Sequence, residues 1–325
     1  MPKPINSLQP ASKRIALLLT PEFALLSYSS VTVPFQYVNC ALGRPAYELY
    51  ICSIGGGPVE DTLGAIHHPK FAATALPAPP DIVIVCAGRN AERHVDRPLL
   101  RWLREMARRG IHMGAVSTGS YALAAAGLLD GYRATIHWQN EASFSEAFPR
   151  VIQSSAIFEI DRNRMTCSGG TAATDMALQI IAKDHGTDLA LKCAEEFLHD
   201  RIRTADDLQR PGRGRALANR SQALADAVNA IERLQPGEVS LDALARAAGV
   251  SSRHLERLFR EILDTTPKRY MSEAKLMFAR RMLLQSDIKI VEVAEAAKFS
   301  SPSYFCQSYS KRFGLPPSAE RKRRI

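Results

Sequence analysis

The first 200 residues alternate short, continuous apolar runs with segments of helical periodicity. Strands that are apolar on both faces are typical of a parallel sheet covered by helices on each side. Apolar residues at spacings of three and four, as in "FALLSYSSVTVPFQYVNCAL" and "RPLLRWLREMARRG", predict the helices that lie between the strands. This pattern predicts an α/β domain with a largely parallel sheet. The four runs are "RIALLLT" (14–20), "YELYICSI" (47–54), "DIVIVCAG" (81–88) and "IHMGAVS" (111–117).

Two more helical segments close this domain. "GGTAATDMALQIIAKDHG" at 169–186 has an apolar stripe between terminal glycines, and "TDLALKCAEEFLHDRIR" at 187–203 predicts a further helix. The stretch 204–220 is rich in arginine, glycine and proline and poor in apolar residues, which is typical of a linker. We therefore expect one domain over 1–203, a linker over 204–220 and a second domain over 221–325.

The second domain has a wholly helical pattern that repeats. In "SLDALARAAGVSSRHLERLFREIL", beginning at Ser240, a helix breaks at Gly249 and a second helix follows, as in a helix-turn-helix. The same frame returns in "KIVEVAEAAKFSSPSYFCQSYSKRFG", about 49 residues later. Between the two, a segment that starts at Pro267 predicts a helix of about twenty residues. The pattern predicts an all-α domain with two helix-turn-helix units.

Composition and charge narrow the function classes. With 46% hydrophobic residues in 325, the chain is long enough for two buried cores, and no run approaches the ~20 apolar residues of a membrane helix, so we expect a cytoplasmic protein with no membrane partner. Six scattered cysteines suggest neither disulfides nor a zinc site, and no pattern indicates a metal or cofactor. Residues 1–200 hold 18 Lys and Arg against 19 Asp and Glu, whereas 201–325 hold 24 against 14. The balance is −1 in the first part and +10 in the second, which indicates an anionic partner such as nucleic acid for the second.

The repeated frame resembles the DNA-binding domain of the AraC/XylS transcription regulators over about residues 221–325. The segments that carry the resemblance are "LARAAGVSSRHLERLF", "TPKRYMSEAKLMFARRMLL", "VAEAAKFSSPSYFCQSY" and "KRFGLPP". In that family two helix-turn-helix units on one linker helix place their recognition helices in successive major grooves. The resemblance implies double-stranded operator DNA as a partner and admits RNA polymerase as a second one.

By position, this resemblance assigns residues on both recognition helices to DNA. We expect Arg257 to be able to pair with a guanine in the bidentate manner typical of arginine, and Gln307 to favour adenine. The alternative is that Arg253 and Arg257 only solvate a helix, but the duplicated frame argues against it. Two positions depart from the family: Lys298 replaces the usual turn glycine, and Gln307 replaces an arginine. The assigned residues are Ser252, Arg253, His254, Glu256 and Arg257 in the first unit and Pro302, Ser303 and Gln307 in the second.

"GAVSTGSYALAAAGLLDG" at 114–131 raises the question of catalysis. An apolar run stops at Ser117 and a helix follows at once, as in the turn that presents a nucleophile, and Ala115 and Gly119 supply the small flanking residues that such an elbow needs. Together with "TCSGGTAATDMAL", this stretch resembles the class I glutamine-amidotransferase-like domain of the intracellular-protease superfamily, in the version fused to AraC-type domains. The resemblance implies a flavodoxin-like sandwich. Its enzymes carry cysteine where this chain has Ser117.

A serine does not inherit the chemistry of that cysteine. A thiol becomes a thiolate beside a histidine and a helix N-terminus, whereas a serine needs a positioned general base. The resemblance implies His137 for this role and Glu22 as the acid that orients it. His137 and Trp138 also have a simpler interpretation as residues of the core. Three functions stay open for the domain: a ligand sensor, which we favour, a serine hydrolase, and an inactive scaffold for dimerisation.

As a sensor, the domain would hold an effector at the carboxyl ends of the strands. Backbone N–H groups at the elbow suit a carboxylate, and aromatic rings, for which Tyr121, Trp138 and Phe144 are candidates, suit a quaternary ammonium. The resemblance is strongest to regulators of glycine betaine, carnitine or arginine breakdown. It implies a small nitrogenous carboxylate as effector, and a homodimer. The candidate ligand-binding residues are Glu22, Ser117, Thr118, Gly119, Tyr121, His137 and Trp138.

Overall fold

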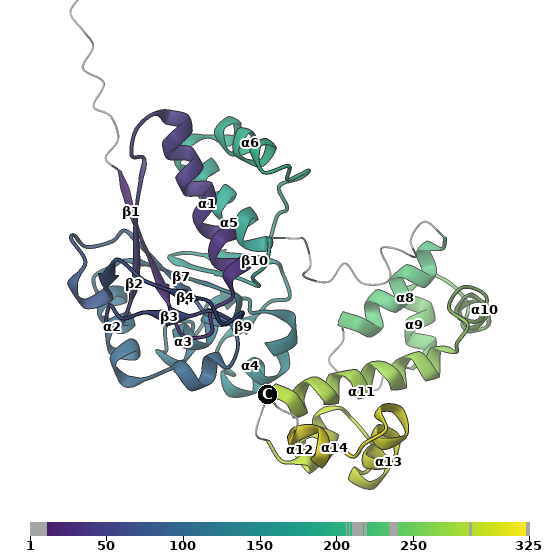
Figure 1. Cartoon of the computed structure of the whole chain (residues 1–325). Helices are drawn as coiled ribbons and strands as arrows, with labels where there is room; N and C mark the ends of the chain where they lie inside the picture. Colours follow the sequence, from purple (N-terminus) through teal and green to yellow (C-terminus); the bar gives the residue numbers. More distant parts are fainter. Residues whose placement is uncertain are drawn as a thin grey trace, which may run out of the picture. The chain divides into compact units, whose positions relative to one another are not determined.

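The computed structural model divides the chain into two compact units, Met1–Gln209 and Arg210–Ile325. It describes residues 12–205, 207, 209, 217, 220–233, 240–285 and 288–322. Most of the expected linker therefore lies outside the described residues. The first unit is α/β and the second is helical (Figure 1), so the predicted fold class is confirmed.

A seven-stranded sheet, in the order β10-β11-β7-β6-β1-β2-β5, forms the centre of the first unit. All neighbouring strands are parallel except β10 and β11, which are antiparallel. The four strands predicted from apolar runs are confirmed to within a few residues. The sheet strands are β1 (Lys13–Leu19), β2 (Tyr47–Ser53), β5 (Phe71–Ala72), β6 (Ile82–Cys86), β7 (His112–Val116), β10 (Phe158–Asp161) and β11 (Arg164–Cys167).

Helices cover both faces of this sheet, as the apolar strands require. One core lies between the sheet and α1 (Leu25–Leu42), α5 (Ala172–His185) and α6 (Thr187–Glu196). The other lies beneath α2 (Arg97–Arg108), α3 (Ser120–Ala125) and α4 (Glu141–Ala147) (Figure 1). Smaller elements complete the unit: strands β3 (Val59–Glu60), β4 (Ile66–His67), β8 (Arg133–Ala134) and β9 (Ile152–Gln153), and 3-10 turns η1 (Ala73–Ala75), η2 (Ala91–His94), η3 (Ser117–Gly119) and η4 (Trp138–Asn140).

The predicted helix over 187–203 is wrong beyond Glu196. α6 ends there, and Leu198 has a left-handed backbone with φ +51°. The residues that follow turn back because His199 and Arg203 bind the carboxylate of Asp175 on α5. A pairing between side chains that lie 24 and 28 residues apart outweighs the helical pattern of this stretch.

The helical unit contains the two predicted helix-turn-helix units. α9 and α10 form the first unit, and α12 and α13 form the second. The helix α11 contacts α10 of the first unit and α12 of the second. Its bounds match the predicted helix of about twenty residues. Ser240 caps α9, as expected, by accepting a hydrogen bond from the Ala243 amide. The helices are α8 (Gln222–Arg233), α9 (Leu241–Ala247), α10 (Ser252–Leu263), α11 (Pro267–Gln285), α12 (Ile290–Ala296), α13 (Pro302–Phe313) and α14 (Pro317–Lys322).

The turns of the two units use the same backbone with different residues. Gly249 has φ +67° in the first turn, and Lys298 has φ +54° at the matching place in the second. The lysine that replaces the usual turn glycine therefore adopts a left-handed backbone, which is strained for a residue with a side chain. Ser251 caps α10 and Ser301 caps α13, so the second turn is one residue longer than the 49-residue repeat suggests. When the recognition helices α10 and α13 are aligned on their caps, Arg257 therefore occupies the same position as Gln307.

Candidate functional site

Four neighbouring strands of the sheet bring the candidate site residues to one edge. Glu22 follows β1, Gly88 follows β6, Ser117 follows β7 and Gly169 follows β11. These strands are consecutive in the sheet and parallel, so their carboxyl ends meet. Open α/β sheets bind ligands at this edge.

Strained backbone gathers at the same edge. Ser117, Glu22 and Asn90 have φ values of +60°, +56° and +52°, a region that side-chain-bearing residues avoid. Such residues persist where the surrounding structure holds them, and they cluster at functional sites. The elbow predicted at Ser117 therefore has the backbone of a nucleophile elbow.

Glycines let the backbone segments of the site approach one another. A Cβ at Gly119 would lie 2.4 Å from the Val85 carbonyl oxygen, and one at Gly88 would lie 2.2 Å from that of Glu22. Both contacts are with backbone atoms that have little room to move. The close approach of β6 therefore explains why a small residue, Gly119, is needed two positions after Ser117.

Ser117 is buried and its side chain faces the loop that follows β11. A Cβ at Gly169 would lie 2.8 Å from Ser117 Cβ and 2.8 Å from Ser27 Oγ. Ser27 Oγ also accepts a hydrogen bond of 2.8 Å from the Gly170 amide. Within the described part of the chain, no hydrogen bond reaches Ser117 Oγ, so the hydroxyl has no base beside it.

Glu22 pairs with residues that the sequence reasoning missed. One carboxylate oxygen accepts hydrogen bonds from Asn90 Nδ2 and His94 Nε2, each 3.0 Å long. The hydrogen bond from His94 is the main reason why the pKa of Glu22 is lowered. Glu22 was expected to orient His137, but the structure gives it His94 instead. The polar stretch after the strand "DIVIVC" is the signal that could have revealed Asn90.

His137 lies just before the turn η4, with Trp138 beside it. Its Nδ1 accepts a long hydrogen bond of 3.4 Å from the Gln139 amide. With Nδ1 accepting, a neutral ring carries its proton on Nε2, and among the described residues no hydrogen bond joins His137 to Ser117. Burial lowers the pKa of His137 and favours this neutral form. The rings of His137 and Trp138 are tilted, with centroids 5.6 Å apart.

Tyr121 and Phe144 belong to a buried aromatic cluster. Phe144 is fully buried, and its ring packs edge-on against Tyr121 and tilted against Phe148. The Tyr121 hydroxyl pairs with Ser143 Oγ at 2.9 Å. Both side chains are buried in this core, so of the three rings considered for an ammonium cage, Trp138 alone is not part of it.

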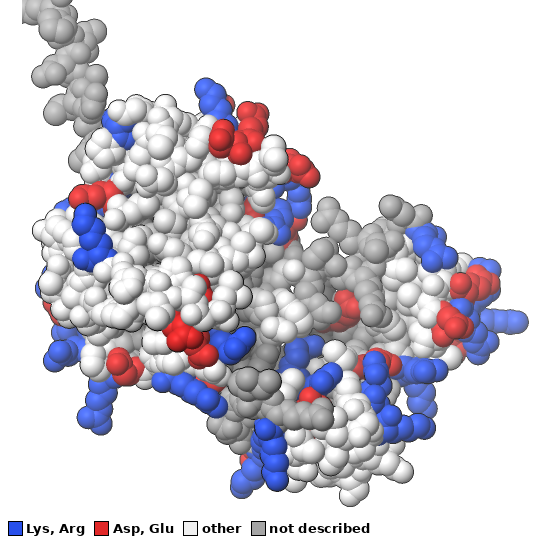
Figure 2. All heavy atoms as spheres, in the orientation of Figure 1, with Lys and Arg blue, Asp and Glu red and all other residues white. Residues whose placement is uncertain are grey.

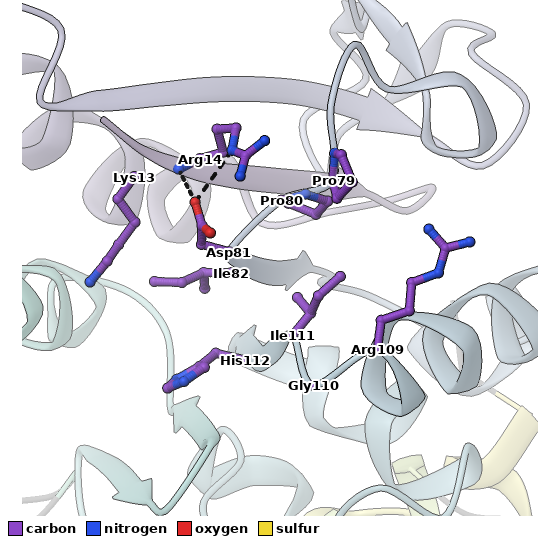
Figure 3. A pocket seen from close by; sticks show the side chains of 10 residues that line it. All are labelled: Lys13, Arg14, Pro79, Pro80, Asp81, Ile82, Arg109, Gly110, Ile111 and His112. Atoms are coloured by element: carbon purple, nitrogen blue, oxygen red, sulfur yellow. Dashed lines mark hydrogen bonds and ion pairs between the residues drawn. The ribbon is translucent and has the colours of Figure 1, made fainter. Parts of the chain in front are cut away.

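A separate pocket of about 380 Å³ lies at the opposite edge of the sheet, where β1, β6 and β7 begin (Figure 3). Its cations are largely engaged: Lys13 pairs with Asp184, Arg14 with Asp81 and Arg109 with Glu105. This pocket is remote from the elbow, because the strands run between the two edges. It has no part in the candidate site.

The first recognition helix, α10, presents a basic surface. Arg253, His254 and Arg257 are exposed, and Arg257 forms an ion pair of 3.5 Å with Glu261 one turn away. Such a surface pair is worth only ~0.2–0.5 kcal/mol, so a DNA contact can replace it. Ser252 instead donates a hydrogen bond to Asp242 on α9, which ties the two helices together. Glu256 is half-buried.

The second recognition helix, α13, presents no charge at the matching positions. Pro302, Ser303 and Gln307 are all exposed. Tyr304, which is 53% exposed, matches His254. Lys and Arg side chains nevertheless gather over the visible surface of the helical unit (Figure 2), and the Lys311–Arg312 pair closes α13.

The described residues form no metal cluster and no membrane-spanning helix. Among the described residues, no three His, Cys, Asp or Glu side chains are placed to hold a metal ion. Over the same residues, no helix has the length and apolar character needed to cross a membrane.

An α/β unit with a strained elbow, followed by a double helix-turn-helix unit, defines a two-domain regulator of the DNA-binding class. Residues 13–183 match the DJ-1/PfpI family, and residues 244–323 match the family described as helix-turn-helix domain. The chain belongs to the AraC-type transcriptional regulators that carry an N-terminal DJ-1/PfpI domain.

Two relatives agree with this assignment over nearly the whole chain, and a solved structure agrees over more than half of it. The HTH-type transcriptional regulator GbdR of Pseudomonas aeruginosa is 40% identical over 95% of this chain and 84% of its own length. The HTH-type transcriptional regulator GlxA of Rhizobium meliloti is 36% identical over 96% of each chain. A crystal structure of an AraC family transcriptional regulator from Pseudomonas putida matches 57% of this chain and 99% of its own, with 28% identity and a TM-score of 0.51.

Proposed function

We propose that this chain regulates transcription by binding a specific DNA sequence through its helical unit and a small metabolite at the elbow of its α/β unit. The single observation that carries the proposal is the combination of a double helix-turn-helix with a strained turn at the carboxyl ends of parallel strands, where no hydrogen bond joins Ser117 Oγ to a base among the described residues. The relatives that match over both units are named transcriptional regulators.

DNA binding is supported by the two recognition helices. Exposed arginines on α10 suit phosphates and guanine, whereas Gln307 on α13 suits adenine. We infer that the first unit supplies most of the electrostatic attraction and that the second adds sequence preference with little charge. The full set proposed to face DNA is Ser252, Arg253, His254, Glu256, Arg257, Pro302, Ser303 and Gln307.

A small nitrogenous carboxylate is the effector class that fits the elbow. Backbone N–H groups of Ser117, Thr118 and Gly119 suit a carboxylate, and the Glu22 carboxylate, held by His94, suits a cationic nitrogen. Trp138 adds a ring that suits an alkylated ammonium. An amino acid or a quaternary amine with a carboxylate would satisfy both ends of such a site.

Catalysis by Ser117 is the second candidate function, and the geometry argues against it. A serine nucleophile needs a base within hydrogen-bond reach, and His137 accepts from Gln139 instead. We expect purified protein to show no Ser117-dependent turnover of esters or amides. Hydrolysis that is present in the wild type and lost in Ser117→Ala would establish the enzyme.

Assembly as a homodimer is proposed as well. Leu26, Val33 and Leu42 of α1 are exposed apolar side chains, which suit a contact with a second copy. Sedimentation of the purified chain would show a dimer if this is right.

The test of effector binding is a thermal-shift screen of amino acids and quaternary amines. A ligand at 100 times its Kd stabilises by about 2.7 kcal/mol. We expect a hit with wild type and none with Ser117→Leu, whose isobutyl group fills the space beside Gly169. Thr187→Leu is the control, because Thr187 is exposed and lies beyond the far end of α5. An equal shift in Ser117→Leu would place the ligand elsewhere.

A further inference from the structure

A buried carboxylate fastens the segment that leaves the α/β unit. Asp175, in the first turn of α5, has a fully buried side chain. It accepts hydrogen bonds from His199 Nε2 at 2.8 Å, from the Arg203 amide at 2.7 Å, and from Arg203 Nε and Nη2 at 2.9 and 2.7 Å. Both guanidinium bonds reach the same oxygen, Oδ2, while Oδ1 accepts from His199 and the Arg203 amide, so both carboxylate oxygens are held by charge-assisted or backbone bonds. We call the described residues that follow α6, up to Gln209, the exit segment.

The same arginine touches the loop that packs on the elbow. Arg203 Nη2 donates to Thr171 Oγ1 at 2.9 Å. Thr171 directly follows Gly169 and Gly170, and Gly169 lies against Ser117 so closely that it has no room for a Cβ. A displacement at Ser117 therefore reaches Arg203 through a single loop.

A second anchor joins the exit segment to the other side of the elbow. Gln209 Nε2 donates to Thr135 Oγ1 at 2.9 Å and to the Ile136 carbonyl at 2.8 Å, next to His137. The Thr135 carbonyl in turn accepts a hydrogen bond of 2.7 Å from Ser120 Oγ. Ser120 directly follows the turn η3 (Ser117–Gly119) that contains the elbow serine. The Gln209 amide also donates to the Ser155 carbonyl at 3.3 Å.

We propose that the exit segment senses the occupancy of the elbow through these two anchors and transmits it to the start of the linker. The proposal rests on the proposed function, since it assigns the regulation of that same site. An effector seated on Ser117 presses on Gly169 on one side and on the Ser120–Thr135 contact on the other. Close-packed interiors pass such small shifts on. The Arg203 and Gln209 anchors then tighten or loosen together, and the described residues of the exit segment gain or lose freedom.

The test uses a substitution that disturbs the elbow without any ligand. Gly169→Ala places a methyl group 2.8 Å from Ser117 Cβ at a residue with φ +95°. Gly186→Ala is the matched control, because Gly186 has φ +92° and nothing within 4 Å of a Cβ. Hydrogen exchange of the full chain, followed by mass spectrometry, reports on the amides of the exit segment. We expect exchange there to rise at least tenfold in Gly169→Ala and to stay within twofold of wild type in Gly186→Ala.

Ser120→Ala is a milder variant for the case in which Gly169→Ala fails to fold. It removes only the bond to the Thr135 carbonyl, and we expect exchange at Gln209 to rise at least threefold. Faster exchange confined to Ser27, Ser117 and their neighbours, with the exit segment unchanged in both variants, would overturn the relay and leave effector binding intact. A thermal-shift screen without hits, together with a coupled exit segment, would instead refute the proposed function alone.

Discussion

Single substitutions at the two left-handed turn positions should change the stability of the two helix-turn-helix units in opposite directions. Lys298 has φ +54° and Gly249 has φ +67° at matching positions. We predict that Lys298→Gly stabilises the second unit and that Gly249→Ala destabilises the first. The Lys298 side chain is exposed, and the contact made by this residue, with Lys275 Nζ, uses its carbonyl oxygen. The substitution therefore removes strain and little else.

The magnitude follows from two opposing effects. A left-handed backbone costs a side-chain-bearing residue ~1–2 kcal/mol, and glycine gives back ~0.4–1 kcal/mol through the entropy of the unfolded chain. Lys298→Gly should therefore stabilise by about 0.5–1 kcal/mol. A Cβ at Gly249 meets nothing within 4 Å, so Gly249→Ala should cost a similar amount through the backbone alone.

Native-state hydrogen exchange resolves the two units within one chain. Both tryptophans, Trp102 and Trp138, lie in the α/β unit, so their fluorescence does not report on the helical unit. Amides of α12 and α13 should exchange about two- to fivefold more slowly in Lys298→Gly, as ~0.5–1 kcal/mol requires. Faster exchange in that variant would refute the account of the second turn, because it would mean that the lysine is the better residue there.

The remaining predictions concern DNA, packing and pH. Arg257→Ala should weaken binding to a selected operator by roughly 1–3 kcal/mol and relax the sequence preference at one base pair. Fluorescence anisotropy on a set of single-base operator variants measures both effects. An equal loss of affinity on every sequence would reassign Arg257 to a phosphate contact. Glu320→Ala should weaken the attachment of α14 to α11 by about 2 kcal/mol, because it leaves Arg280 without its 2.9 Å ion pair. The cost is below that of a fully buried pair, since Arg280 is 38% exposed; unchanged exchange in α14 would contradict this. Burial lowers the pKa of His137 from 6.5, so its contribution to stability is complete above pH 6.5 and is lost as the pH falls below it. Urea unfolding at pH 7.5 and 5.5 should accordingly show a smaller loss in His137→Gln than in wild type, and an equal loss would exclude His137 as a cause.

The sequence predicts those helices and strands that a local residue pattern determines. It does not predict the ones that depend on contacts between distant parts of the chain. The apolar runs predict β1, β2, β6 and β7, because a doubly covered parallel strand needs no partner to be recognised. By contrast, β5, β10 and β11 are short and carry little periodicity. The two helix-turn-helix units could be predicted because their duplication is visible in the sequence alone. The extra residue in the second turn is evident only from the structure, where Ser301 caps α13.

The candidate site shows the same division. The elbow at Ser117 is a local turn, and its positive φ could be expected from the flanking small residues. The pairing of Glu22 with His94 joins two loops that lie 72 residues apart, and no spacing rule indicates it. The early end of α6 has the same kind of cause, since Asp175 is the partner that the sequence does not reveal.

The central claim is that occupancy of the elbow controls DNA binding, and fluorescence anisotropy tests it most directly. The probe is a labelled duplex selected by the purified chain from random-sequence DNA, with and without the compound that gives the largest thermal shift. Coupling of 1–3 kcal/mol corresponds to a change of about 5- to 150-fold in the Kd for DNA. We predict a change of at least fivefold in wild type and no ligand-dependent change in Ser117→Leu, whose Kd for the duplex should be the same with and without the compound. The same change in both proteins, or no duplex selected at all, would contradict the account.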